Sequence, residues 1–278
     1  MSHEMLKIPV LTYHSANISG NEYQSNDHVA LHHDLEILNN LGYQVIPAKW
    51  LVDWLTGCKN LDQSERYVVL TFDDGVSLDF HDWIHPEHGF QKSFFNILSD
   101  FSDKYPKQQP NVHASCFVIA SKQARKNIQD KALAGHSLLG DEWWIDAENT
   151  QLLSIENHSW DHNHSACEET AQKSGTTGRF DVIDSYKECD IEVRQASEFI
   201  QEIIGKKQLL FAYPWGQYNE YLAHEYFPKF KNEHKAQAAF IVEPEHVNSQ
   251  TNTWLIPRYV CGEHWKSQKQ LVDIIYKK

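Results

Sequence analysis

The stretch YVVLTFDDG, residues 67–75, carries the strongest structural signal in the 278-residue chain. Its first six residues are continuously apolar, aromatic or β-branched, which is typical of a parallel strand buried on both faces. Asp73 and Asp74 end this run, and Gly75 permits a sharp bend after them. Because strand side chains alternate between faces, two adjacent carboxylates can serve one site only where the strand ends and bends.

The two carboxylates also repel each other, which raises the pKa of one of them unless a cation lies between them. We therefore expect one carboxylate to bind a metal ion and its neighbour to remain free to accept a proton. An Asp-Asp-Gly turn without a catalytic role is the competing interpretation of this segment alone.

Short apolar runs alternate with helical patterns through the rest of the chain. We expect further strands at residues 8–13, 45–46, 114–120, 152–156, 209–213, 238–242 and 254–256. Helical spacing predicts helices over residues 31–41, 121–134, 183–204 and 271–276. This alternation is typical of parallel β/α units, and about seven or eight strands is near the size of a β/α barrel. We predict one α/β domain over residues 1–278.

Composition excludes several classes of partner. Lys plus Arg total 25 and Asp plus Glu total 38, and the formal net charge of −13 argues against binding to nucleic acid or to anionic membranes. No apolar run approaches the ~18 residues of a membrane span. The five cysteines are scattered singly, and the first residues lack the pattern of a secretory signal. We expect a cytoplasmic protein, or a secreted or periplasmic one if the sequence is trimmed, and leave its oligomeric state open.

A second segment, HSWDH at residues 158–162, places two histidines four positions apart. On a helical turn His158 and His162 would share a face and could bind one ion, as in zinc sites. Ser159 stands where the H-E-x-x-H proteases carry Glu, so a general base must come from elsewhere. With 17 histidines in the chain, two surface histidines without a ligand are the alternative.

A third segment, FAYPWGQYN at residues 211–219, follows a predicted strand with an aromatic-Pro-aromatic-Gly turn. Tyr213, Pro214 and Trp215 would form a rigid wall against substrate, because aromatic faces commonly stack on sugar rings. Taken alone, a hydrophobic strand followed by a Pro-Gly turn explains most of this pattern. All three segments lie at the carboxyl ends of predicted strands, where active sites form in parallel β/α folds.

In this order, the segments resemble the motifs of the polysaccharide deacetylase family, the NodB-homology domain of carbohydrate esterase family 4. The family's T-F-D-D-G motif is intact at residues 71–75, and its H-[ST]-x-x-H motif is matched at residues 158–162. Its R-x-P-[YW] motif, followed by Gly, is matched at residues 214–216 but has Ala212 in place of Arg. The opening VLTYH, residues 10–14, looks like the start of a subset of the family, so the similarity covers nearly the whole chain.

This resemblance implies a distorted (β/α) barrel of about seven parallel strands. It also implies one divalent metal ion, with zinc as the first choice and cobalt, nickel or iron as other occupants. Carried over by position, Asp74, His158 and His162 would hold the metal, and Asp73 would be the general base. Ser159 would orient a ligand histidine.

Two departures from the family pattern concern catalytic groups. Arg258, near the end of a late strand, could supply the guanidinium missing at Ala212, although an exposed loop Arg is an equal alternative. The family's L-x-H motif, whose His is the general acid, has no clean match. His264, His246 and His14 are the candidates, and His14 is also a candidate substrate-binding residue.

The expected function is metal-dependent removal of acetyl groups from N-acetylated sugars in a glycan or glycan precursor. Asp73 would take a proton from water acidified by the ion, and the backbone N–H of Trp215 would meet the oxyanion. A non-catalytic carbohydrate-binding relative is the alternative, because two catalytic groups depart from the family pattern. Two histidines and one carboxylate also suit non-haem iron chemistry, although the second Asp favours hydrolysis.

Overall fold

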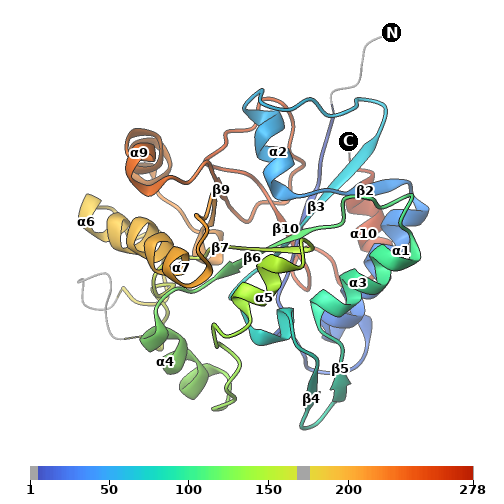
Figure 1. Cartoon of the computed structure of the whole chain (residues 1–278), viewed down its shortest axis with the longest axis horizontal. Coiled ribbons are helices and arrows are strands. Elements are labelled where there is room, and N and C mark those ends of the chain that lie inside the picture. The colour runs from blue at the N-terminus through green and yellow to red at the C-terminus, as the bar shows by residue number, and fades with distance from the viewer. Residues whose placement is uncertain (1–5, 168–175, 278) are drawn as a thin grey trace.

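An eight-stranded sheet forms the centre of the computed structural model, which describes residues 6–167 and 176–277 (Figure 1). Its strands are β1 (Val10–Tyr13), β2 (Tyr43–Val45), β3 (Arg66–Phe72), β6 (Ala114–Val118), β7 (Leu153–Asn157), β8 (Leu210–Ala212), β9 (Ala238–Phe240) and β10 (Tyr259–Val260). They run in the order β10-β1-β3-β6-β7-β8-β9, and β2 pairs with β3 off this path. All of these pairings are parallel.

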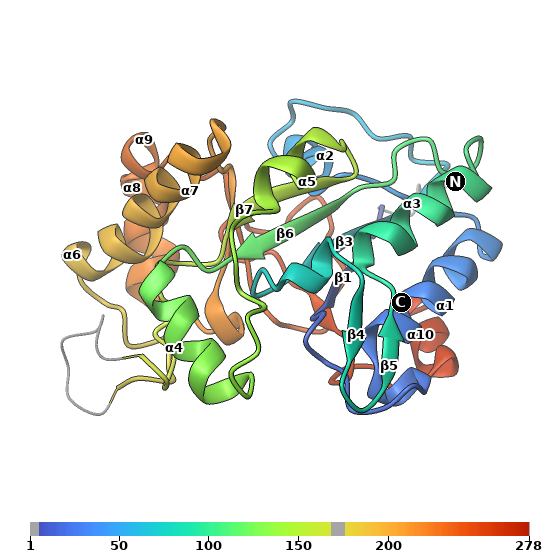
Figure 2. The ribbon, with the colours of Figure 1, turned by 60° about the horizontal axis from the view of Figure 1, so that its bottom comes forward.

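Helices surround the sheet. They are α1 (Asp27–Asn40), α2 (Ala48–Leu55), α3 (Phe94–Lys104), α4 (Lys122–Ala132), α5 (Trp144–Asn149), α6 (Tyr186–Cys189), α7 (Ala196–Ile204), α8 (Phe227–Lys229), α9 (Lys231–His234) and α10 (Gln268–Ile275). Figure 2 shows α1, α3 and α10 grouped on one side of the molecule and α6 to α9 on the other. A π-helical turn, Asp190–Gln195, joins α6 to α7.

The two ends of the sheet curl towards each other. A parallel bridge joins Phe240 of β9 to Ile256, and Tyr259 of β10 pairs with Leu11 of β1. The last strands of the chain therefore nearly close the ring between β9 and β1. This arrangement confirms the predicted distorted barrel of about seven parallel strands.

The alternation of side chains along β3 positions the candidate site. Leu70 and Phe72 belong to the core shared with α1 and α3, whereas Val69 belongs to the cluster inside the barrel. Thr71 is buried and points inward like Val69, and Asp73 continues this inward series. The strand therefore delivers one carboxylate to the interior at the point where it ends.

Two expectations about local structure are wrong in detail. Residues 254–256 do not form a strand. Only Ile256 makes a bridge, because Pro257 has no N–H to continue the ladder, and the strand resumes as β10. The helix expected over residues 183–204 begins at Tyr186 and contains the π-helical turn.

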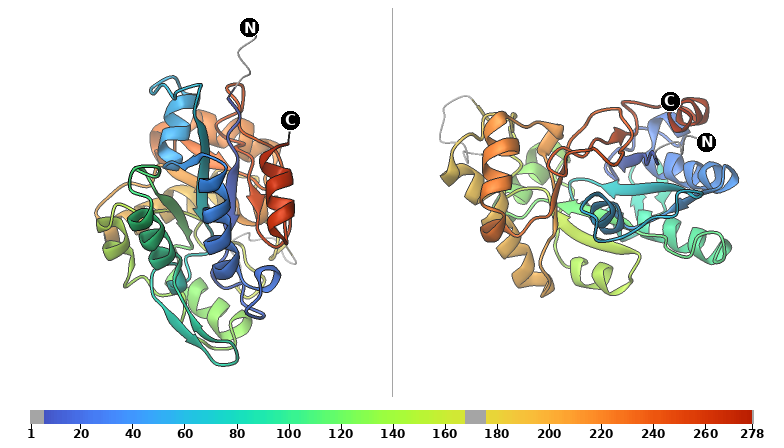
Figure 3. Two further views of the ribbon diagram at one scale, coloured as in Figure 1. Left: turned by 90° about the vertical axis from the view of Figure 1, so that its right-hand side faces the viewer. Right: turned by 90° about the horizontal axis from the view of Figure 1, so that it is seen from above.

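A protruding antiparallel hairpin, β4 (Trp83–His85) and β5 (Gly89–Gln91), was not among the predicted elements. It lies at the end of the molecule opposite α2 (Figure 3), which is the end towards which the parallel strands run. No helix in the described ranges is long and apolar enough to cross a membrane. Residues 1–5, on which the expectation about a leader partly rests, lie outside those ranges.

Candidate functional site

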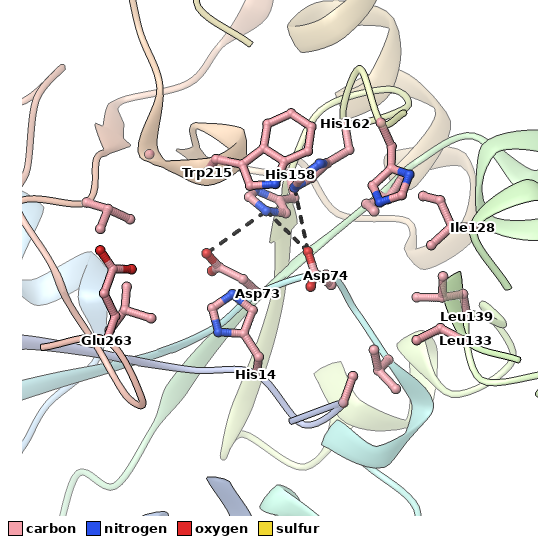
Figure 4. Close-up of a pocket in the computed structure, with 17 residues that line it drawn as sticks. His14, Asp73, Asp74, Ile128, Leu133, Leu139, His158, His162, Trp215 and Glu263 are labelled. Atoms are coloured by element: carbon pink, nitrogen blue, oxygen red, sulfur yellow. Dashed lines mark ion pairs between the residues drawn. The ribbon is translucent and has the colours of Figure 1, made fainter. Parts of the chain in front are cut away.

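A pocket of about 470 Å³ opens at the carboxyl ends of the strands. All three sequence segments reach it, although they are far apart in the chain (Figure 4). Its polar lining consists of His14, Asp73, Asp74, His158, His162, His164 and Glu263, and Trp215 adds an indole ring.

A left-handed bend after β3 brings both carboxylates to this pocket. Asp74 has φ 77° and Gly75 has φ 68°. The strand alternation therefore ends at Asp73, and Asp74 does not point to the opposite face of the sheet. A Cβ on Gly75 would lie 2.7 Å from the side chain and 2.9 Å from the Cα of Val118, so only glycine fits there. Positive φ is costly for a residue with a side chain, and such strain is concentrated at functional sites.

Asp73 forms a two-point ion pair with Arg258. The Nη1 and Nη2 atoms of Arg258 donate to Oδ1 and Oδ2 of Asp73 at 2.7 and 2.8 Å. Arg258 is fully buried and also donates to Thr71 Oγ1 and to the carbonyl of Ile241. The guanidinium that the third motif lacks at Ala212 thus comes from just before β10.

This ion pair controls the charge of Asp73. Burial alone would raise its pKa, but the positive charge of Arg258, with His158 nearby, outweighs burial and lowers the pKa to about 2. Asp73 is therefore a carboxylate throughout the neutral pH range, although it is only 4% exposed.

His158 and His162 present imidazole nitrogens to Asp74. His158 Nδ1 lies 2.8 Å from the carbonyl of Ala212, which can only accept, so Nδ1 carries the proton and Nε2 is left with a lone pair. Burial lowers the pKa of both histidines, which keeps the rings neutral. Neutral imidazole is the form that ligates metal ions.

The donor geometry fits a single metal ion. The Nε2 atoms of His158 and His162 each lie 3.6 Å from Asp74 Oδ1, which is too long for a hydrogen bond. Two ligands about 2.1 Å from one ion at a tetrahedral angle lie roughly 3.4 Å apart. The three ligand atoms all lie within 4.8 Å of one another, so these residues could hold a divalent cation.

The segment that carries the histidine pair is a loop after β7 and not the helical turn expected from the spacing. Ser159 and His162 both have positive φ, 75° and 63°, and these two bends turn the histidine rings together. The Ser159 hydroxyl accepts the backbone N–H of His162 at 2.9 Å. Ser159 therefore fixes the backbone beneath a candidate ligand and makes no hydrogen bond to Nδ1 of its ring.

A buried glutamate on the π-helical turn, Glu192, also holds this loop. Its Oε2 accepts the backbone N–H groups of Trp160 and Asp161 at 3.1 and 3.4 Å. The sequence does not single out Glu192 as a site residue, because a helical pattern does not show which polar residue is buried. Insertion of π turns is frequent at functional sites.

The third segment contributes less to the pocket than expected. Trp215 lines it, with its ring centroid 4.3 Å from that of His162, and has φ 53°. Tyr213 and Pro214 do not line the pocket. The Tyr213 ring is buried in a separate core cluster and its hydroxyl donates to the Trp254 carbonyl. A Cβ on Gly216 would lie 2.5 Å from the backbone N of Val242, so glycine is required after Trp215.

The three candidate general acids lie in different places. His14, at the end of β1, lines the pocket, and Figure 4 shows its ring beside Asp73. His264 does not line the pocket, and its Nδ1 accepts the backbone N–H of Val260. His246 lies elsewhere, with its Nδ1 3.3 Å from the hydroxyl of Tyr259.

Comparisons with known proteins bear on the family and the fold of this chain. The polysaccharide deacetylase family matches residues 60–226 of the chain. No curated protein matches the sequence. The Streptococcus pyogenes deacetylase PplD, solved in complex with acetate, matches with a TM-score of 0.64 and 15% identity over 99% of this chain and 100% of that one.

Two further solved structures have similar folds. The de-N-acetylase from Aggregatibacter actinomycetemcomitans matches with a TM-score of 0.63 and 18% identity over 96% of this chain and 99% of that one. IcaB from Ammonifex degensii matches with a TM-score of 0.62 and 16% identity over 97% and 95%. At these identities the structural likeness supports the fold, and the family match is carried by the sequence.

Proposed function

Because this chain belongs to the polysaccharide deacetylase family, we propose that it is a metal-dependent hydrolase that removes acetyl groups from N-acetylated sugars of an oligo- or polysaccharide. The observation that carries this proposal is the convergence of Asp74, His158 and His162 beside a carboxylate that Arg258 keeps ionised. The proposed ion is zinc, with cobalt, nickel and iron as the alternatives that such ligands accept.

Asp73 is the proposed general base. Asp74, His158 and His162 would hold a divalent ion, which would supply Lewis acidity towards the amide carbonyl and the attacking water. Each oxygen of Asp73 bonds to one N–H of Arg258, and its remaining lone pair is free to accept the water proton.

His14 is the proposed general acid. It lines the pocket beside Asp73, whereas His264 and His246 do not line it. Its backbone N–H donates to Asp27 Oδ2 at 2.9 Å, which fixes the chain at the end of β1. The proton held by His14 passes to the leaving nitrogen as the carbon–nitrogen bond breaks, giving acetate and a free amino sugar. The backbone N–H of Trp215 is the proposed donor to the oxyanion.

A non-catalytic carbohydrate-binding relative is the alternative. The absence of the motif Arg and of the late histidine motif from the sequence suggests this alternative. The Arg258–Asp73 pair and the place of His14 offer a source for both groups, so the geometry favours the enzyme.

The test measures metal content and acetate release from N-acetylglucosamine oligomers. Asp74→Asn should lose both bound metal and activity, whereas Asp73→Asn should retain metal and lose activity by about 10²–10⁴-fold. Wild-type rates of acetate release from Asp74→Asn would exclude the proposal. Oligomer binding without acetate release by metal-loaded wild-type protein would favour the binding relative, and activity that requires oxygen and iron would indicate oxidative chemistry.

A further inference from the structure

A second hollow adjoins the reaction pocket, at the foot of the hairpin β4–β5. Its volume is about 500 Å³, and it shares Ala16 and Leu133 with the reaction pocket. In Figure 4, Leu133 lies on the far side of Asp74 from Glu263, so the reaction pocket extends from Glu263 towards the second hollow. We call this space the hairpin hollow. Its main lining residues are Trp83 and His85 of β4, His136 of the segment after α4, and Ile18, Leu78 and Leu138.

Three rings form the wall of the hairpin hollow. The centroid of the Trp83 indole lies 5.0 Å from that of His85 and 5.4 Å from that of His136, with interplanar angles of 73° and 71°. His85 shares a face of the strand with Trp83, because it is two positions further along. The contact with His136 joins the hairpin to the segment after α4, so the two sides of the hollow support each other.

His85 has a fixed proton position. Its Nδ1 accepts the backbone N–H groups of Glu87 and His88 at 3.0 and 3.2 Å. A backbone N–H can only donate, so Nδ1 carries the lone pair and the proton of the ring is on Nε2. The wall therefore offers an N–H donor next to an indole.

The hairpin is tied to the body of the protein. The side chain of Gln91 is buried, and its Oε1 accepts Asn26 Nδ2 at 2.7 Å. At the start of α3, the backbone N–H of Ser93 donates to Asp82 Oδ1 at 2.7 Å. These bonds hold both ends of the hairpin, so the hollow is formed before any ligand binds, which lowers the entropic cost of binding.

The lining matches a neutral carbohydrate better than an acyl chain or an anion. Sugar rings combine apolar C–H faces with hydroxyl groups, and the hollow combines an apolar floor, an indole and the imidazole donor of His85. An acyl chain would leave that donor without a partner. No Lys or Arg is among the described residues that line the hollow, and Glu87 is, so an anionic ligand would be repelled.

We propose that the hairpin hollow binds a neighbouring sugar residue of the same oligosaccharide whose acetylated residue occupies the reaction pocket. Trp83 and His85 are then determinants of substrate length, and the protein acts on oligomers in preference to the monosaccharide. This inference rests on the proposed function, because it assigns the substrate of the same site.

The test compares Trp83→Ala with Ile84→Ala, a matched control on the same strand. Ile84 is 74% exposed and is not among the residues lining the hollow, so its loss should change nothing. For the wild type, kcat/KM for acetate release should rise with the length of N-acetylglucosamine oligomers. Trp83→Ala should raise KM for the longer oligomers by about tenfold and leave the monosaccharide rate unchanged.

A binding measurement separates this inference from the proposed function. In the Asp73→Asn background, calorimetric affinity for the longest oligomer should fall when Trp83 is replaced, even if no variant releases acetate. His136→Ala, from the segment after α4, should act in the same direction and serves if Trp83→Ala does not fold. Equal affinities with and without Trp83, or an equal loss of kcat/KM at every oligomer length, would overturn the assignment.

Discussion

Asp73 in the reaction pocket and Asp34 on the buried face of α1 are both buried carboxylates, 4% and 0% exposed, but their partners differ in charge. Arg258 faces Asp73 and, with His158, lowers its pKa to about 2 despite burial. Among the described residues the hydrogen-bond donors to Asp34 are neutral, and burial raises its pKa from 3.8 to about 6 although those donors act in the opposite direction.

The donors to Asp34 come from three parts of the chain. The hydroxyl of Tyr13 and the indole N–H of Trp265 donate to Oδ2 at 2.9 and 3.0 Å, and the hydroxyl of Tyr23 donates to Oδ1. Hydrogen bonds alone therefore satisfy a buried carboxylate without offsetting the loss of hydration. A site that needs a charged base needs a cation, and this fold supplies it from Arg258, 185 positions after Asp73.

Removing the positive charge of Arg258 should have the largest effect on both stability and activity. Arg258→Met leaves Asp73 as an uncompensated buried charge, which should lower the free energy of unfolding by about 3–5 kcal/mol. Acetate release should fall by about 10²–10⁴-fold, because Asp73 becomes neutral or misplaced. Urea unfolding and kcat/KM measure the two effects.

The double variant Asp73→Asn/Arg258→Met is the control. It removes both charges, so most of the lost stability should return while activity stays absent. If Arg258→Met unfolded at the same urea concentration as the wild type, the ion pair would not be what holds Asp73 charged, and the contrast with Asp34 would fail.

The same contrast explains what the sequence could predict. Residues 67–75 predicted both the central strand and the bend, because their signals are local: apolar continuity, two carboxylates and a glycine. From the sequence, Arg258 could equally be the partner of Asp73 or an exposed loop residue. The two residues are 185 positions apart, and whether they pair depends on which strands become neighbours. The sequence contains no local signal for that contact.

The hairpin β4–β5 and the general acid show the same limit. Trp83 and Ile84 favour a strand, but the run is only three residues long. The hairpin is held by distant contacts such as that of Gln91 with Asn26, which the sequence does not show. His14 and His264 were indistinguishable as residue types, and only the pocket separates them.

Measuring the stability of the wild type and of Asp34→Asn across pH should show an effect of intermediate size and test the contrast with Asp73. The folded pKa of Asp34 lies above its unfolded value, so the folded state binds the proton more tightly, and the wild type gains stability from this group as pH falls from about 6 to about 4. The variant has no such group. The wild-type minus variant difference in the free energy of unfolding should therefore increase by about 1–3 kcal/mol between pH 7 and pH 4.

Unfolding midpoints in urea at each pH measure this gap, with Glu220→Gln as the control, because the Glu220 side chain is 91% exposed. The control should follow the wild type across the series. A signed difference that decreased on acidification would mean that Asp34 is held ionised like Asp73, and neutral donors would then be sufficient to offset burial.

Glu192→Gln should have the smallest effect on stability and activity. It tests the contrast between charged and neutral partners at the loop that carries His158 and His162. Glu192 accepts two backbone N–H groups of this loop, which are neutral donors like those around Asp34. A glutamine carbonyl can accept the same bonds, so the free energy of unfolding should fall by only about 1 kcal/mol and metal affinity by about tenfold or less.

Glu192→Ala removes the acceptor altogether and should weaken metal binding further, as measured by competition with a chelator, while activity at saturating metal stays near the wild-type value. If Glu192→Gln were instead as damaging as Arg258→Met, the negative charge of Glu192 would itself be required, and the distinction between carboxylates that serve as charges and carboxylates that serve as acceptors would not hold for this fold.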